Sequence, residues 1–375
     1  MSLVELLSKL ISFRSITPND DGCLEFITKI LLNMGFKCKK LDFGNSSNRT
    51  KNIYAHFSRG SGTHFCFAGH VDVVPPGDNW KSDPFKATKK NGYIFGRGAC
   101  DMKSSIAAFV NAVNSFLKKT KGFKGTISLI LTSDEEGDAE LGTKKVIQWL
   151  KKEKIKIDFC LVGEPTSRKK IGDMAKIGRR GSINCNLTVK GKQGHVAYPE
   201  KARNPITDLI RLCSELKKPF DKGNSFFPPT NLEITSIDTE NKITNLIPEK
   251  VTAKFNIRFN NSYNSKTLIK TLKKRLDNLK THYELSTKIS GESFLNQSNI
   301  LNTHLEKSIF EITKENVEFS TSGGTSDARF ISKICPVVEF GSVGETMHQI
   351  DEKVKIKDLD LLSKIYFDLL NRVYS

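Results

Sequence analysis

The stretch TISLILTSDEEG, residues 126–137, combines a strand-like run with an acidic turn and is the most informative part of the chain. Six of its first seven residues are apolar or β-branched, which is typical of a buried strand. Two adjacent carboxylates, Glu135 and Glu136, follow on the turn. Because neighbouring side chains on a turn point in different directions, one carboxylate can bind a metal ion while the other transfers protons. An acidic pair on a turn is by itself more often a solvated surface feature, so the interpretation depends on the rest of the chain.

Further side chains that can bind a metal ion or support one that does occur at four other places in the chain. They are His70 with Asp72, Asp101, Glu164 and His348. Two histidines and three carboxylates can then serve as ligands, and a further carboxylate remains as a base. This is the set of groups that a two-metal hydrolase requires.

Length and composition indicate a soluble globular protein. The 375 residues favour two domains over one, and 38% of the residues are hydrophobic and 27% charged. We find neither a signal peptide nor an apolar run of the ~20 residues that a membrane span needs, and we predict no membrane association. The eight cysteines form no C-x-x-C pair. Their scatter argues against a disulfide framework or a cysteine zinc site and predicts a location in the reducing cytoplasm.

The formal charge of +18 raises the question of nucleic-acid binding. Lysines are spread along the whole chain, and we find no helix-turn-helix, RNP or zinc-finger signature. We therefore predict no nucleic-acid partner. A basic surface would instead increase the encounter rate with an anionic substrate.

Helical and strand-like patterns alternate in the first half of the chain. The predicted helices cover residues 3–13, 22–34 and 103–118, and the predicted strands cover residues 52–57, 64–68, 126–132 and 158–162. This alternation predicts an α/β layer with a largely parallel or mixed sheet.

The pattern changes after Arg179. Strands are predicted at 182–189, 231–237, 251–259 and 283–289, with helices at 204–216 and 265–279. The order βαββαβ is that of a ferredoxin-like unit. Because His348 lies beyond it, we predict a catalytic domain built from residues 1–179 and 293–375, with a small domain inserted at 180–292.

The local sequence supports metal binding at several of the candidates. His70 ends a predicted strand, where α/β proteins place ligands. Asp72 shares the face of His70 if the strand continues, so its carboxylate is expected to accept the second ring N–H and fix the tautomer. Asp101 follows a glycine-rich segment and can either bridge two cations or cap the next helix. Glu164 ends a buried strand and needs a partner, for which a metal ion is the best candidate.

Spacing alone does not decide whether Glu135 or Glu136 binds metal, but a family resemblance does. The chain resembles the M20 family of zinc aminoacylases and peptidases in HVDVVPPGD (70–78), GACDMK (98–103), DEEG (134–137), GEP (163–165) and the late His348. Further matching runs are RRGS (179–182), GHVAYP (194–199), FFPPT (226–230) and GGTSD (323–327). The resemblance covers essentially the whole chain.

The resemblance implies an α/β zinc hydrolase with two metal sites and an inserted ferredoxin-like dimerisation domain. Asp101 would bridge two zinc ions, which cobalt or manganese could replace at such ligands. The remaining ligands would be His70 and Glu164 at one site, and Glu136 and His348 at the other. Glu135 would be the general base, and Asp72 would support His70.

The resemblance also implies a homodimer that hydrolyses the amide of an N-succinylated diamino acid carrying three carboxylates. Arg179 and Arg258 suit bidentate carboxylate binding, and the turn with Gly324 and Thr325 can supply further donors. His195 and Asn245 would act across the dimer, and Tyr198 would contact the substrate.

Two alternatives remain open. A deacetylase or dipeptidase of the same family would share every metal ligand, whereas a non-catalytic relative would be expected to lack Glu135 or a ligand. One position departs from the family pattern: Gly344 stands where related enzymes often carry Asn.

Overall fold

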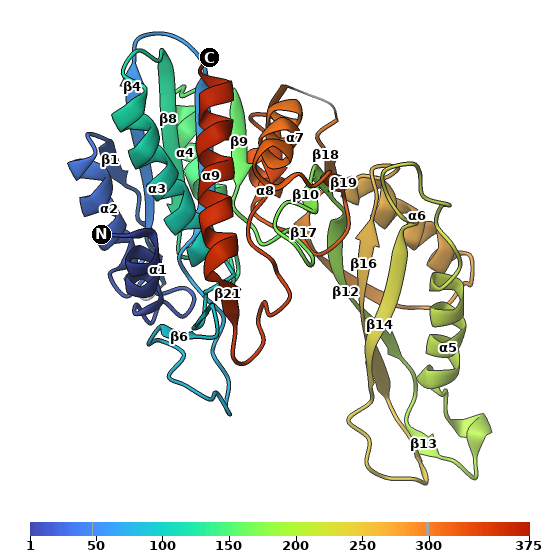
Figure 1. Ribbon diagram of the computed structural model, residues 1–375. Helices are drawn as coiled ribbons and strands as arrows, with labels where there is room; N and C mark the ends of the chain where they lie inside the picture. The colour runs from blue at the N-terminus through green and yellow to red at the C-terminus, as the bar shows by residue number, and fades with distance from the viewer. Residues whose placement is uncertain (47, 298–299) are drawn as a thin grey trace. The chain divides into compact units, whose positions relative to one another are not determined.

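The computed structural model describes residues 1–46, 48–297 and 300–375 (Figure 1). These residues form two compact units. The first comprises Met1–Ile177, Asn296–Ser320 and Ser326–Ser375, and the second comprises Gly178–Leu295 with Thr321–Thr325.

A mixed eight-stranded sheet forms the centre of the first unit. Its order is β1 (Lys37–Lys40), β4 (Asn52–Arg59), β8 (Gly125–Thr132), β5 (His64–His70), β9 (Phe159–Val162), β20 (Val337–Glu339), β10 (Met174–Lys176) and β19 (Glu318–Ser320). Strand β5 runs parallel to β8 on one side and to β9 on the other, while β4 is antiparallel to β8. The central strands are apolar and buried, as parallel strands covered on both faces must be.

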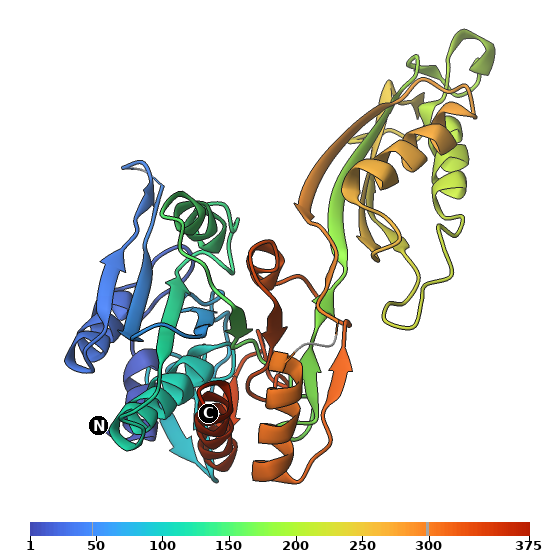
Figure 2. The ribbon, with the colours of Figure 1, turned by 90° about the horizontal axis from the view of Figure 1, so that it is seen from above.

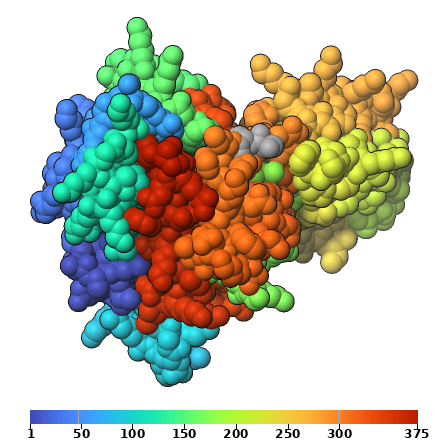
Figure 3. All heavy atoms as spheres, turned by 45° about the horizontal axis from the view of Figure 1, so that its top comes forward, coloured from blue at the N-terminus to red at the C-terminus, as the bar shows by residue number. Residues whose placement is uncertain are grey.

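Helices cover both faces of this sheet. They are α1 (Leu3–Ile11), α2 (Cys23–Asn33), α3 (Lys103–Lys119), α4 (Thr143–Lys152), α7 (Ile300–Thr313), α8 (Ala328–Ile331) and α9 (Ile356–Val373). Figure 2 shows α3 and α9 on one face and α4 on the other, and α9 lies between α3 and α7 (Figure 3).

Aromatic packing joins the sheet to α3 and α9. The ring of Phe67 stacks on that of Phe109 with centroids 4.2 Å apart, and Tyr366 meets both rings edge-on at 5.9 Å. Small strands complete the unit: β21 (Lys353–Lys355), β7 (Tyr93–Phe95) and β6 (Thr88–Lys90) form one sheet, and β2 (Phe43–Gly44) pairs with β3 (Arg49–Thr50).

The second unit contains a four-stranded antiparallel sheet. Its order is β14 (Asn231–Asp238), β16 (Lys250–Phe259), β12 (Gly181–Lys190) and β17 (Glu284–Gly291). Buried and exposed residues alternate along β12 and β16, so one face carries the core. Leucines of α5 (Pro205–Leu216) and α6 (Ser265–Asp277) pack on that face. The shorter elements are β11 (Gly178–Arg179), β13 (Gly194–His195), η1 (Pro199–Lys201), β15 (Leu246–Ile247) and β18 (Phe294–Leu295).

Each predicted helix and strand is present in the structure in the predicted order, and the structure contains further elements that were not predicted. Every predicted element of the second unit lies within two residues of its observed bounds, in the order βαββαβ. In the first unit, β5 continues two residues beyond its predicted end and stops at His70. Among the helices that the structure describes, none is both long and apolar enough to cross a membrane.

Candidate metal centre

Candidate ligands lie at or just after the ends of three neighbouring strands, at one edge of the sheet. His70 is the last residue of β5, Glu135 and Glu136 follow the end of β8, and Glu164 follows the end of β9. Because β5 is parallel to both neighbours, the carboxyl ends of all three strands meet at this edge. Open α/β sheets bind ligands at such an edge.

Asp101 and His348 reach the same place from irregular segments. Asp101 is 5% exposed and precedes α3, with a cis peptide bond to Met102. His348 lies between β20 and β21 with φ of +61°, and its side chain is 46% exposed. A left-handed backbone is uncommon for a residue other than glycine, and such conformations cluster at functional sites.

The carboxylate of Asp101 lies between the two histidines. Its Oδ1 is 3.3 Å from Nε2 of His70, and its Oδ2 is 3.1 Å from Nε2 of His348. Oε1 of Glu136 lies 2.9 Å from the same atom of His348, and Oε1 of Glu164 lies 4.0 Å from Nε2 of His70. One carboxylate that faces two imidazoles with separate oxygens has the arrangement expected of a ligand shared by two cations.

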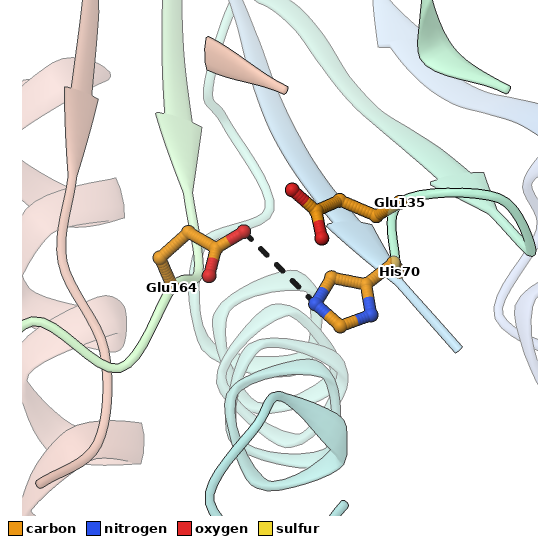
Figure 4. Close-up of side chains that lie close together, drawn as sticks. All are labelled: His70, Glu135 and Glu164. Carbon is orange, nitrogen blue, oxygen red and sulfur yellow. Dashed lines mark ion pairs between the residues drawn. The ribbon is translucent and has the colours of Figure 1, made fainter. Parts of the chain in front are cut away.

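The ligand atoms fall into two overlapping groups. His70, Glu135 and Glu164 form one, and His70, Asp101 and Glu136 form the other, with the atoms of each group within 4.8 Å of one another. Figure 4 shows the carboxylates of Glu135 and Glu164 directed toward the ring of His70. Distance alone therefore does not separate Glu135, the predicted base, from the predicted ligands.

The predicted hydrogen bond between the ring of His70 and the carboxylate of Asp72 is wrong. Nδ1 of His70 donates to the main-chain oxygen of Asp72 at 2.9 Å, whereas the nearest carboxylate oxygen is 3.6 Å away. The reason is that β5 ends at His70, so the two side chains do not alternate along a continuing strand. A carbonyl oxygen can only accept, so the tautomer is still fixed with Nε2 facing the cluster.

The carboxylate of Asp72 instead holds the acidic turn. Its Oδ2 accepts the backbone N–H groups of Glu135 at 3.1 Å and Glu136 at 3.0 Å. Burial raises the pKa of Asp72 to about 6. The Asp72 side chain therefore holds the backbone of the turn and, with it, the directions of the Glu135 and Glu136 side chains.

The cluster fits a cation on two observations. Nε2 of His70 and Oδ1 of Asp101 are buried and have no hydrogen-bond partner among the described residues. Buried polar atoms are normally hydrogen-bonded, and imidazole nitrogen and carboxylate oxygen are ligands for zinc and similar ions. A divalent cation between them would satisfy both atoms.

The pKa shifts in the cluster follow from its charges. Hydrogen bonds with Asp101 and then Glu136 raise the pKa of His348 to about 10. Although burial opposes the shift, the neighbouring imidazoles of His348 and His70 lower the pKa of Asp101. Burial and the negative charge of Glu164 raise the pKa of Glu135 well above its usual range, which suits a group that must accept a proton near neutral pH.

Two buried residues near this centre, Arg97 and Glu352, were not predicted from the sequence. Both are buried and form an ion pair at 2.8 Å. The available signals were an arginine between two glycines at 96–98 and a glutamate four residues after His348.

In the second unit, Arg179 lies against the turn formed by residues 321–325. Its Nη1 donates to the main-chain oxygen of Ser322 at 3.4 Å. Gly323 has φ of +101°, and a Cβ there would lie 2.7 Å from the same Nη1. Because φ is positive and the guanidinium is close, only glycine fits at position 323 without strain. The turn that contains Gly324 and Thr325 therefore packs closely against the Arg179 guanidinium.

The other predicted substrate residues occupy two places in this unit. Arg258 lies on β16, where it pairs with Ser182 and Asn231 of the adjacent strands. His195 and Tyr198 are exposed, with ring centroids 5.9 Å apart.

Asn245 belongs to the same region as His195. Its main-chain oxygen accepts from the N–H of Val196 at 3.1 Å. His195, Tyr198 and Asn245 therefore lie together.

The structure gives a physical reason for the glycine at position 344. A Cβ there would lie 2.7 Å from the main-chain oxygen of Pro165, in the residue after the candidate ligand Glu164. The chain must therefore move before an asparagine can occupy this position.

Comparison with known proteins identifies relatives over nearly the whole chain. The succinyl-diaminopimelate desuccinylase of Pelagibacter ubique (strain HTCC1062) is 49% identical, with 99% of this chain and 98% of the relative covered. That of Orientia tsutsugamushi (strain Ikeda) is 46% identical, with 98% and 95% covered.

Solved structures share the fold at low sequence identity. An M20 family metallo-carboxypeptidase from Sulfolobus solfataricus superposes with a TM-score of 0.82 at 18% identity, covering 100% of this chain and 99% of that one. The YXEP protein of Bacillus subtilis, a dinuclear metal-binding peptidase of family M20, gives a TM-score of 0.72 at 13% identity, with 99% and 96% covered. The family model for Peptidase family M20/M25/M40 matches residues 66–372. The chain belongs to this family.

Proposed function

We propose that this chain is a metal-dependent amidohydrolase that converts N-succinyl-LL-2,6-diaminopimelate to succinate and LL-2,6-diaminopimelate, a step of lysine and diaminopimelate biosynthesis. The observation that carries the chemistry is the carboxylate of Asp101 between His70 and His348. The relatives named as desuccinylases, which align over nearly the full length, support the choice of substrate.

Two zinc ions are the proposed cofactors, and cobalt or manganese are expected to substitute at ligands of this type. Asp101 would be shared by both ions. His70 and Glu164 would complete one site, and Glu136 and His348 the other. When bound, such ions supply Lewis acidity that activates water and polarises the scissile carbonyl.

Glu135 is the proposed general base. Its raised pKa allows it to take a proton from the attacking water and to return that proton to the departing amine. Asp72 contributes by accepting the backbone N–H of Glu135, which keeps this carboxylate beside His70 and Glu164. Its neighbour Glu136 is then directed toward His348.

The proposed substrate has three carboxylates, and the second unit has suitable donors. Arg179 and Arg258 would bind carboxylates with their planar guanidinium groups. Gly324 and Thr325 would add an N–H and a hydroxyl, and Tyr198 would contact the substrate.

The functional domains that we propose are a catalytic domain, residues 1–179 and 293–375, and a ferredoxin-like dimerisation domain, residues 180–292. In the homodimer, His195 of one subunit would stabilise the oxyanion formed in the other, and Asn245 would also act across the interface. The exposure of His195 is consistent with a role toward a second subunit.

We further propose that the protein works in the cytoplasm. The eight cysteines, all within the described ranges, are free, and all but Cys38 are buried. Unpaired buried thiols are typical of proteins from reducing compartments.

The test is a comparison of initial rates on two substrates with the zinc-loaded protein. N-succinyl-LL-2,6-diaminopimelate should be hydrolysed faster than N-acetylornithine, because only the former offers the extra carboxylates that the arginines can bind. Preference for N-acetylornithine would refute the proposed substrate and leave the metal chemistry standing. Hydrolysis of neither compound would refute the proposed function.

A further inference from the structure

The ion pair between Arg97 and Glu352 is buried in the first unit. Arg97 is 2% exposed and Glu352 is 0% exposed, and Nη1 of the arginine lies 2.8 Å from Oε2 of the glutamate. Removing two charges from water is unfavourable unless many further hydrogen bonds compensate. The hydrogen-bond partners of this ion pair therefore indicate its role in the structure.

Glu352 binds the backbone that leads to Asp101. Its Oε1 accepts the N–H groups of Cys100 at 2.8 Å and Asp101 at 3.1 Å, and its Oε2 accepts the N–H of Gly98 at 3.0 Å. Its main-chain oxygen accepts from Gly96 at 2.9 Å. One residue thus holds the segment from Gly96 to Asp101, so that the Asp101 side chain is left free to face the histidines.

Arg97 binds two other segments of the centre. Its Nη2 donates to the main-chain oxygens of Pro75 at 3.3 Å and Pro76 at 3.1 Å, in the turn after Asp72. Its Nη1 donates to the oxygen of Gln349 at 3.0 Å, next to His348. The guanidinium also lies 5.2 Å from the ring of Trp80, which follows the same turn.

We propose that Arg97 and Glu352 are positioning residues that hold the backbone segments of Asp72, Asp101 and His348 in the arrangement that a metal centre would need. Three segments far apart in the sequence carry Asp72, Asp101 and His348. Their backbones are joined through this one ion pair, whose contacts lie on loops rather than on strands of the sheet. The inference rests on the proposed function, because it assumes that Asp101 and His348 bind metal.

The geometry also explains why both charges are needed. The carboxylate offers acceptors to three N–H groups and the guanidinium, whereas a glutamine would turn an amide N–H₂ toward some of these donors. A lysine in place of Arg97 would keep the charge but could not reach three carbonyl oxygens and the glutamate from one planar group.

The experiment measures zinc affinity, by competition with a chromophoric chelator, for the wild-type protein, Glu352→Gln and Arg97→Lys. Each is first shown to be folded by circular dichroism. We expect zinc to bind about 10- to 100-fold more weakly in both variants, as is typical when groups behind metal ligands are changed. Arg97→Lys provides an independent result if Glu352→Gln does not fold.

A control variant separates positioning from general loss of stability. Leu369→Ala truncates a side chain of α9 that is 1% exposed and should lower the melting temperature while leaving zinc affinity unchanged. Wild-type zinc affinity in a folded Glu352→Gln protein would overturn the inference, and so would an equal loss of affinity in Leu369→Ala. A wild-type protein that binds no zinc would refute the metal centre itself, which distinguishes that failure from the failure of positioning.

Discussion

The carboxylate of Asp72 accepts the backbone N–H of Glu136 at 3.0 Å, and the same oxygen accepts that of Glu135 at 3.1 Å. Asp72 is fully buried, so these charge-assisted bonds are not shared with water. One aspartate therefore positions both the proposed base and a proposed ligand, while its main-chain oxygen orients His70.

Replacement of Asp72 by Asn should displace the acidic turn. Asparagine has nearly the same size, but loses the charge that strengthens both hydrogen bonds. We expect turnover and zinc content to fall together, because the neutral amide is a weaker acceptor for the two N–H groups. Initial rates and metal analysis test this. Normal zinc content with normal turnover would contradict the positioning role of Asp72.

Replacement of Glu135 by Gln should remove the proposed base without disturbing the fold. We expect kcat to fall by about 10²- to 10⁴-fold, as for loss of a general acid–base group, with zinc content unchanged. Glu140→Gln, on the exposed surface of the same loop, is the matched control and should retain full activity. Full activity in Glu135→Gln would exclude it as the base.

Zinc binding should release protons. The pKa of His348 is about 10 because of Asp101 and Glu136, so at pH 7.5 its imidazole carries a proton that zinc must displace. Zinc affinity should therefore rise as pH increases from 7 toward 10. Calorimetric titration in buffers of different ionisation enthalpy measures the number of protons released per zinc ion bound. This number should be smaller in His348→Gln. A binding enthalpy that is independent of the buffer would argue against this linkage.

Mixing two inactive variants should restore activity if His195 acts across a dimer. His195→Ala should lose turnover but keep its zinc. When it is mixed with Glu135→Gln and the subunits exchange, each mixed dimer contains one complete site, so about a quarter of the wild-type activity is expected for random pairing. Each variant incubated alone is the control. Exchange without recovery would place His195 in the site of its own subunit.

The turn beside Arg179 offers a test of substrate binding. In Gly323→Ala, the new Cβ would lie 2.7 Å from Nη1 of Arg179 and would need a left-handed backbone. We expect KM for the succinyl substrate to rise about tenfold, or about 1.4 kcal/mol of binding energy, with zinc content unchanged. Gly122→Ala, in the first unit with open space around its Cβ position, is the control. An unchanged KM would show that this turn does not contact the substrate.

Much of the secondary structure was predictable because it follows local periodicity. The alternation of apolar residues along β12 and β16 and the helical spacing of leucines in α6 indicate their elements directly. The short strands β10, β19 and β20 were not predicted, since three residues carry too little pattern to be recognised.

The two histidines, the candidate carboxylates and the βαββαβ order were evident from the sequence, because residue identity and local periodicity are read along the chain. How these groups meet follows from the folded unit. That the main-chain oxygen of Asp72, rather than its carboxylate, binds His70 depends on where β5 stops. That Arg97 meets Glu352 depends on contacts between residues 255 positions apart. Periodicity reports the environment of one element, whereas a hydrogen bond between distant loops depends on the folding of the whole unit.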